Sequence, residues 1–410
     1  MGPVGGGWGR PLPAAARRKT LRCRLYSLKS QGAIRFCFLY TMHLSFRCLA
    51  FGGLGWLAGC IEPYEPPREA RDANLLVVDG FINSAGVTSV RLSRTQSLSA
   101  KGSAPAEKQA RVFVEEENGA RYPLREGVAG TYTSGALLLP AGRLVRLRLT
   151  TAQGREYASG YTRVLHTPPV DSISSVIGAD KRLRLLVNAH DDANEIHHYR
   201  WSYEETWEFK SRYRSYREFR NGRLSYRSED IQHCWGSEKP SAIKLGSSLH
   251  RSPNAASEPL TVLLDTSPKL SSKYSLLVRQ YALTPEEYAY WVELRRNTEQ
   301  LGTVFSPMPS QLTGNVHSLS DPAEKVLGFV GAQSVTEKRI FIDRNDLPPS
   351  WPLVTGYENC ELYENGTLNL FVDGRYTPVD EGPPGGIYYG TTDCIDCRTR
   401  GTNVRPDFWP

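Results

Sequence analysis

Residues 199–209 read YRWSYEETWEF, and this stretch carries the clearest strand pattern of the chain. Its five aromatic side chains share one parity, and the residues between them are polar or charged. Because successive side chains of a β-strand point to opposite faces, all five aromatics gather on one face. Each can bury roughly 150–250 Å². An exposed face of this kind would be an unusually large apolar patch, so we interpret it as core and not as a surface that stacks sugars.

One acidic residue interrupts this aromatic face. Glu205 has the same parity as the rings, and a buried carboxylate is costly unless it is paired. Glu205 is therefore expected to need a partner if the face is buried.

Shorter strand patterns lie upstream of this stretch. In residues 144–149, LVRLRL, leucines at 147 and 149 alternate with arginines at 146 and 148, as in a strand with one buried face. Similar runs recur from residue 75 to about residue 165, separated by glycine-containing turns, until Pro168-Pro169 breaks the pattern. Short strands at spacings of roughly 8–12 residues predict a β-sandwich of immunoglobulin-like kind.

One helix is expected among the strands, near residues 284–301. Thr284 supplies an N-cap, Pro285 the first helical position and Glu287 an acidic residue three positions after the cap. The predicted fold class is all-β, with two immunoglobulin- or fibronectin-like β-sandwich domains, a helical insertion and a disulfide-rich C-terminal tail. We place the first sandwich at residues 74–166, the second at 167–345 and the Pro/Gly/Cys-rich tail at 346–410.

The run Leu57-Ala58-Gly59-Cys60 has the form of a lipobox, the signal that attaches a bacterial lipoprotein to a membrane. The apolar stretch before it has the length of a secretory signal peptide and is too short to cross a bilayer as a helix. We expect cleavage before Cys60 and its acylation with diacylglycerol and a fatty acid such as palmitate. Residues 1–59 are then a signal peptide with a mistaken extension, the true start is Met42, and residues 60–73 form a Pro/Glu-rich tether.

The net charge changes when this leader is removed. The full chain carries 50 Lys/Arg and 43 Asp/Glu, but residues 1–59 hold nine of the basic residues and no acidic one. The remaining 41 basic and 43 acidic side chains give a charge of about −2 in place of +7. No nucleic-acid partner is expected, because such a partner requires a basic excess. The Arg/Tyr-rich residues 210–230 are interpreted as a solvated hairpin around Asn221-Gly222.

Four cysteines follow Cys60: Cys234, Cys360, Cys394 and Cys397. An even number in an exported protein predicts disulfides. The spacing of Cys394 and Cys397 also fits a redox or zinc site. A thioredoxin-type pair, however, requires a βαβ unit beside it, and structural zinc requires a second close ligand pair. We expect two structural disulfides that pin the C-terminal tail, and the sequence leaves all three pairings open.

Motifs for catalysis are missing from the sequence. It has no GxSxG elbow, P-loop, HExxH or dinucleotide fingerprint on a strand–turn–helix unit, so we expect no enzyme activity and no cofactor. Residues 190–198, HDDANEIHH, have metal-binding types. Their composition is also that of a turn, and His197 and His198 must point to opposite sides of a strand. We favour the turn and expect no metal site; a hydrolase or metal site here is the weakest alternative.

Segments along the chain match a family pattern: Cys60-Ile61-Glu62-Pro63-Tyr64, Val77-Val78-Asp79-Gly80, Tyr199-Arg200-Trp201, Glu205-Thr206-Trp207-Glu208-Phe209, Cys234-Trp235, Tyr281-Ala282-Leu283-Thr284, Tyr290-Trp291, Gly314-Asn315, Val326-Leu327-Gly328-Phe329, Arg339-Ile340-Phe341-Ile342 and Cys394-Ile395-Asp396-Cys397-Arg398. In these segments the chain resembles a lipoprotein family of Gram-negative bacteria known as domain of unknown function forty-two forty-nine. The resemblance implies an outer-membrane lipoprotein, commonly encoded next to a TonB-dependent receptor. It implies no reaction and no catalytic residues.

These observations favour a non-enzymatic accessory protein, anchored through Cys60 in the outer membrane and facing the periplasm or the cell surface. We expect it to work beside a TonB-dependent receptor in ligand binding or uptake, with no metal and an unknown ligand. The alternative is a stand-alone surface adhesin or glycan-binding lipoprotein, because loops at the ends of sandwiches often carry binding sites.

Overall fold

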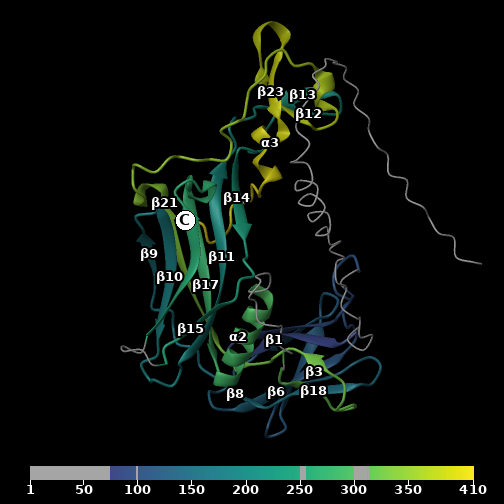
Figure 1. The fold of residues 1–410 in the computed structure, drawn as a ribbon. Coiled ribbons are helices and arrows are strands. Elements are labelled where there is room, and N and C mark those ends of the chain that lie inside the picture. Colours follow the sequence, from purple (N-terminus) through teal and green to yellow (C-terminus); the bar gives the residue numbers. More distant parts are fainter. Residues whose placement is uncertain (1–73, 98–99, 250–254, 300–311, 313) are drawn as a thin grey trace, which may run out of the picture. The chain divides into compact units, whose positions relative to one another are not determined.

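A computed structural model describes residues 74–97, 100–249, 255–299, 312 and 314–410 (Figure 1). Every described residue belongs to one compact unit, Glu69–Pro410. The predicted signal peptide, Met42, Cys60 and the tether at 60–73 lie outside the described residues. Within the described part of the chain, no helix is long and apolar enough to cross a membrane.

The first sandwich is built on one continuous ladder of strands around a single core. Its members before residue 164 are β1 (Leu76–Asn83), β2 (Val87–Arg94), β3 (Arg111–Glu116), β4 (Arg121–Glu126), β5 (Thr131–Ala136), β6 (Leu144–Thr150), β7 (Glu156–Ser159) and β8 (Thr162–Arg163). The order in the ladder is β18-β7-β6-β3-β4-β5-β2-β1-β19, in which β18 (Val316–Ser318) and β19 (Val326–Leu327) come from later in the chain. In β6 the predicted alternation holds, because Val145, Leu147 and Leu149 are buried and enter this core.

The chain returns to the first sandwich after the helix. The strands β18 (Val316–Ser318), β19 (Val326–Leu327) and β20 (Ala332–Gln333) pair with β7 and β1. The Asn315 side chain holds this segment by bonding both the N–H and the carbonyl of Val330. The boundary that the sequence predicts between the two sandwiches, at residues 166 and 167, stays a prediction. That prediction did not foresee that β18, β19 and β20 pair with strands of the first sandwich.

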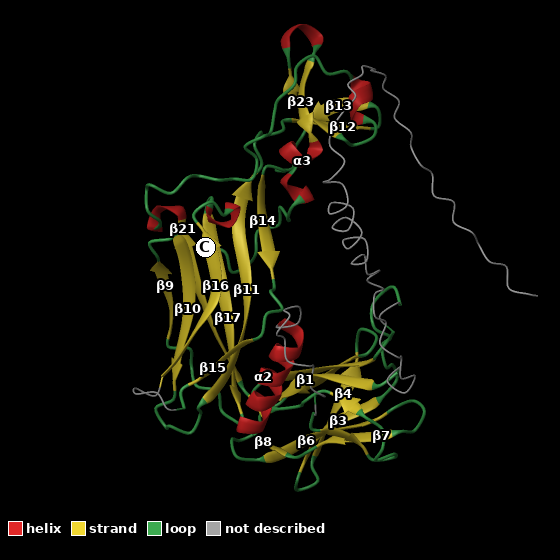
Figure 2. Cartoon of the chain, viewed as in Figure 1, coloured by secondary structure: helices red, strands yellow, loops and turns green. Residues whose placement is uncertain are grey.

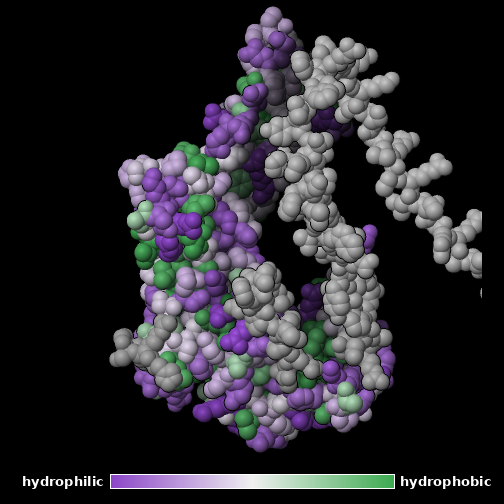
Figure 3. Space-filling model, viewed as in Figure 1, coloured by the Kyte–Doolittle hydropathy of each residue, from purple (hydrophilic) through white to green (hydrophobic). Residues whose placement is uncertain are grey.

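The second sandwich consists of two facing sheets (Figure 2). One contains β16 (Ala255–Leu264), β10 (Arg182–His190) and β9 (Ser172–Ile177). The other contains β14 (His233–Glu238), β11 (His198–Lys210), β17 (Lys273–Leu283) and β21 (Val335–Asp343), with β15 (Lys244–Ser247) beside β11. Their inner faces share one core. Hydrophobic residues show in several places on the surface in Figure 3. Val176 of β9 and Val262 of β16 are among the exposed large apolar side chains.

The aromatic face of β11 is core, as the sequence predicts. Tyr199, Trp201, Tyr203 and Phe209 are buried, and Trp207 packs partly buried against them. Glu205 is only 2% exposed. Its carboxylate accepts hydrogen bonds from Lys269 Nζ at 2.7 Å and from the Tyr274 hydroxyl at 2.6 Å. The partner that Glu205 needs is therefore provided by β17 and by η3 (Pro268–Leu270) before it.

The helix α2 (Pro285–Glu299) lies where the cap pattern predicts it. The Thr284 hydroxyl accepts a hydrogen bond from the backbone N–H of Glu287 at 3.2 Å. This bond satisfies one of the free N–H groups of the first helical turn.

The C-terminal tail folds with the Arg/Tyr hairpin as a third small cluster. The hairpin strands β12 (Arg217–Arg220) and β13 (Arg223–Tyr226) turn at Asn221 and Gly222, both with positive φ. Beside them lie β22 (Tyr376–Glu381), β23 (Ile387–Thr391), α3 (Thr392–Ile395) and the short turns η5 (Leu368–Phe371), η6 (Pro383–Gly385) and η7 (Cys397–Thr399), with η4 (Arg344–Asp346) leading out of β21. Disulfides join Cys234 to Cys397 and Cys360 to Cys394.

Candidate ligand-binding site

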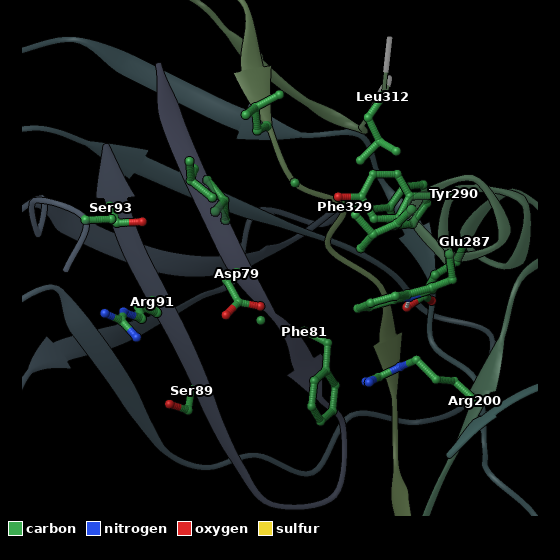
Figure 4. A pocket seen from close by; sticks show the side chains of 18 residues that line it. Asp79, Phe81, Ser89, Arg91, Ser93, Arg200, Glu287, Tyr290, Leu312 and Phe329 are labelled. Carbon is green, nitrogen blue, oxygen red and sulfur yellow. Dashed lines mark hydrogen bonds between the residues drawn. The ribbon is translucent and has the colours of Figure 1, made fainter. Parts of the chain in front are cut away.

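A cavity of about 780 Å³ lies between the strands β1 and β2 of the first sandwich and α2 with β11 of the second (Figure 4). This volume is within the range of small-molecule sites in proteins. The walls are mostly apolar and include Phe81, Tyr290, Trp291, Leu294 and Phe329.

Strand and helix periodicity explain which side chains reach the cavity. On β1 and β2, Asp79, Phe81, Ser89 and Arg91 alternate with residues that face the core of the sandwich. On α2, the lining residues 287, 290, 291 and 294 follow the i, i+3, i+4, i+7 spacing of one helix face. Gly328 completes the wall beside β1. A Cβ at this glycine would lie 2.0 Å from the Val78 carbonyl oxygen, so a side chain would not fit.

Arg200 is one of two cations in the lining of the site, the other being Arg91. Arg200 stands on the polar parity of β11, opposite the aromatic core face. Its guanidinium carbon lies over the Tyr281 ring, 4.2 Å from the centroid, and over the Trp291 ring, 4.4 Å from the centroid. Figure 4 shows the guanidinium directed toward Phe81. Burial lowers the pKa of Arg200, and the Tyr281, Glu287 and Asp79 side chains act against that shift. In the described part of the chain its fully enclosed Nε has no hydrogen-bond partner.

Glu287 is the second polar group, and it is only 2% exposed. Its Oε1 accepts a hydrogen bond from Trp291 Nε1 at 3.4 Å, and no such bond reaches Oε2 among the described residues, although the nearby Gln333 side chain also acts to lower the pKa of the carboxyl group. Burial raises the pKa of Glu287 to about 7, and the positive charge of Arg200 opposes this shift. Gly331 leaves room for the carboxyl group, because a Cβ there would lie 2.1 Å from Oε2.

The arrangement is suited to binding. The lining combines apolar walls with the charged side chains of Arg200 and Glu287. An apolar cavity with a few convergent polar groups is the usual composition of a ligand pocket. Neither Ser, Cys nor His stands beside Arg200 or Glu287 in the lining as a nucleophile with its base.

The residues singled out in the sequence lie elsewhere. Cys394 and Cys397 belong to two different disulfides, so they form no CxxC pair. His190 contacts Asp171 and Asp192 at 2.7 and 3.0 Å. Among the described residues no three His, Cys, Asp or Glu side chains are grouped as metal ligands. The Arg/Tyr hairpin carries stacked pairs such as Arg217 over Tyr226, at 3.7 Å.

Sequence reasoning did not single out Arg200 or Glu287 as residues of a site. Arg200 was assigned to the polar face of its strand, and Glu287 was assigned to a helix cap. The available signals were the spacing of Glu287 with Tyr290, Trp291 and Leu294 on one helix face, and a strand arginine directly flanked by aromatics. Neither signal alone distinguishes a pocket from a solvated surface.

The chain was compared with known proteins. A family model described as "Domain of unknown function (DUF4249)" matches residues 61–339. No curated protein matches the chain. Among solved structures, a segment of two fibronectin type III domains from chicken tenascin is 13% identical, covers 52% of this chain and 93% of that chain, and has a TM-score of 0.16. A DUF4785 family protein from Legionella pneumophila is 12% identical, covers 50% of this chain and 51% of that chain, and has a TM-score of 0.17.

Proposed function

The chain belongs to the DUF4249 family, and on that premise we propose that it is a lipid-anchored, non-enzymatic binding protein of the outer membrane that works beside a TonB-dependent receptor. The observation that carries the binding role is the cavity, where the side chains of Arg200 and Glu287 lie among apolar walls. The lipobox ending at Cys60 supports the anchor.

The anchor is tested by the intact mass of the protein purified from membranes. We expect an amino terminus at Cys60 that carries acyl groups, and a Cys60→Ser chain without them. An unprocessed, unacylated terminus in the wild-type protein would overturn the anchor.

The receptor partnership is tested by recovering the wild-type protein from detergent-solubilised outer membrane and identifying what accompanies it. We expect a TonB-dependent barrel protein with the wild type and none with the Cys60→Ser chain. Absence of any such barrel above background rejects the partnership. A glycan array probed with the Cys60→Ser chain distinguishes the receptor-associated role from the adhesin alternative. Only the adhesin alternative requires the isolated protein to bind glycans.

A further inference from the structure

We infer that the cavity takes a small organic acid with one carboxylate and an aromatic or apolar body, with the carboxylate on Arg200 and the body against the aromatic wall. This inference rests on the binding role proposed above and adds the chemical class of the ligand and the residues that recognise it.

The guanidinium of Arg200 identifies the acid group. A guanidinium presents five N–H donors in a planar fork, which matches the two oxygens of a carboxylate. Here the guanidinium carbon lies over two rings, 4.2 Å from the centroid of Tyr281 and 4.4 Å from that of Trp291, and Arg200 belongs to the lining of the cavity. No ion pair or hydrogen bond links the Arg200 side chain to another residue in the part of the chain that the structure describes.

The opposite wall identifies the body of the ligand. The Tyr290 and Phe329 rings lie 5.4 Å apart with tilted planes, and Figure 4 shows them together on the far side of the cavity from Ser89 and Arg91. Leu294, Leu312 and Leu327 extend this apolar surface. Aromatic or aliphatic groups removed from water are stabilised there, roughly in proportion to the area buried.

The charges around Arg200 favour a ligand that presents a single anionic group there. Asp79 from β1 and Glu287 from α2 both act on Arg200, so a second anionic group would meet two carboxyl groups. Arg91 is the other cation of the lining, at the side formed by β2.

The test is calorimetric titration of the full protein with matched probes. Indole-3-acetate and 3-phenylpropanoate are compared with their neutral amides, and N-acetyl-Gly-Gly-Phe with its C-terminal amide. We expect each acid to bind at least tenfold more tightly than its amide. Tighter binding of indole-3-acetate or 3-phenylpropanoate shows that the carboxylate belongs to a small metabolite. Tighter binding of N-acetyl-Gly-Gly-Phe shows that it belongs to the end of a peptide chain.

Two variants assign the binding to this cavity. Arg200→Gln is expected to weaken the acids at least tenfold and leave the amides unchanged. Ser89→Trp fills the cavity from an exposed position and is expected to abolish binding of both, whereas Ser175→Trp, on an exposed position of β9, leaves binding unchanged.

Three outcomes overturn the inference: equal affinity for acids and amides, undiminished acid binding by Arg200→Gln, or no binding of any acid at millimolar concentration. Should the amides bind as well as the acids and Ser89→Trp block them, only the acid is rejected and the proposed binding role survives. Undiminished binding by Ser89→Trp rejects both the site and the role.

Discussion

At the scale of single residues, the buried carboxyl groups of Glu205 and Glu287 have different surroundings. The carboxyl group of Glu205 accepts hydrogen bonds from Lys269 and Tyr274. Glu287 lacks such a cation partner, and its pKa rises to about 7. The sequence could predict that Glu205 needs a partner, because its parity is visible. It could not supply the partner, which comes from 64 residues later in the chain.

The first prediction concerns Glu287 and pH. The carboxyl group ionises near pH 4.5 when unfolded and near pH 7 when folded, so between these values the folded state binds more protons. The free energy of unfolding therefore falls as pH rises through this window, by roughly 3 kcal/mol for this group. Glu287→Gln removes the effect, and its stability relative to wild type should grow by that amount between pH 4.5 and 7.5.

Urea unfolding at several pH values measures this difference. Glu286→Gln, an exposed neighbour in the same helix, serves as the control and should follow the wild type. A Glu287→Gln curve parallel to wild type at all pH values would falsify the prediction.

The second prediction concerns the Glu205 cluster. Lys269→Ala leaves a buried carboxylate without its cation, so the free energy of unfolding should fall by about 3 kcal/mol. Lys273→Ala removes a surface lysine whose Nζ lies 3.9 Å from Asp343, and should cost about 1 kcal/mol or less. Denaturant unfolding of both variants checks this, and equal losses would contradict the assigned roles.

At the scale of elements, periodicity predicts well where one face is buried and poorly where two surfaces meet. The alternation in β6 and β11 identifies their core faces correctly. The helix α2 is predicted from its cap, yet its contact with the first sandwich is not, since the pattern 287, 290, 291, 294 equally fits a helix on its own sheet. The partner surface of an amphipathic helix is not encoded in its own sequence.

The third prediction tests the helix cap. Thr284→Ala removes the acceptor of the Glu287 N–H and should lower the free energy of unfolding by about 1 kcal/mol. Thr298→Ala is the matched control, because its hydroxyl bonds a carbonyl inside the last turn and satisfies no free N–H. Thermal unfolding followed by circular dichroism distinguishes them; a Thr298→Ala loss as large as that of Thr284→Ala refutes the cap.

At the scale of the whole molecule, the all-β class, the sandwiches and the disulfides of the tail agree with the prediction from sequence. The return of β18, β19 and β20 to the first sandwich could not be predicted. These strands are two or three residues long, too short to show a period, and their partners lie far upstream. The pairing of the cysteines was likewise undetermined, because it depends on which strands bring them together.

The fourth prediction compares the two disulfides. Cys234 and Cys397 are 163 residues apart, and Cys360 and Cys394 are 34 apart. Chain-entropy reasoning gives losses of about 5 and about 4 kcal/mol when each pair is replaced by serine, the longer loop losing more. Unfolding in denaturant should therefore rank Cys234→Ser/Cys397→Ser below Cys360→Ser/Cys394→Ser. The reverse order would show that strain or denatured-state structure dominates.

The position of β1 has a mechanical consequence. Its antiparallel neighbour β2 borders one edge, and β19 and β20, arriving some 250 residues later, run parallel along the other. Force applied to the chain before residue 74 is directed along this strand, against hydrogen bonds on both sides at once. To pull β1 out of the sheet, its hydrogen bonds to β2 on one edge and to β19 and β20 on the other must break. These bonds resist the force together before the rest of the sandwich can open.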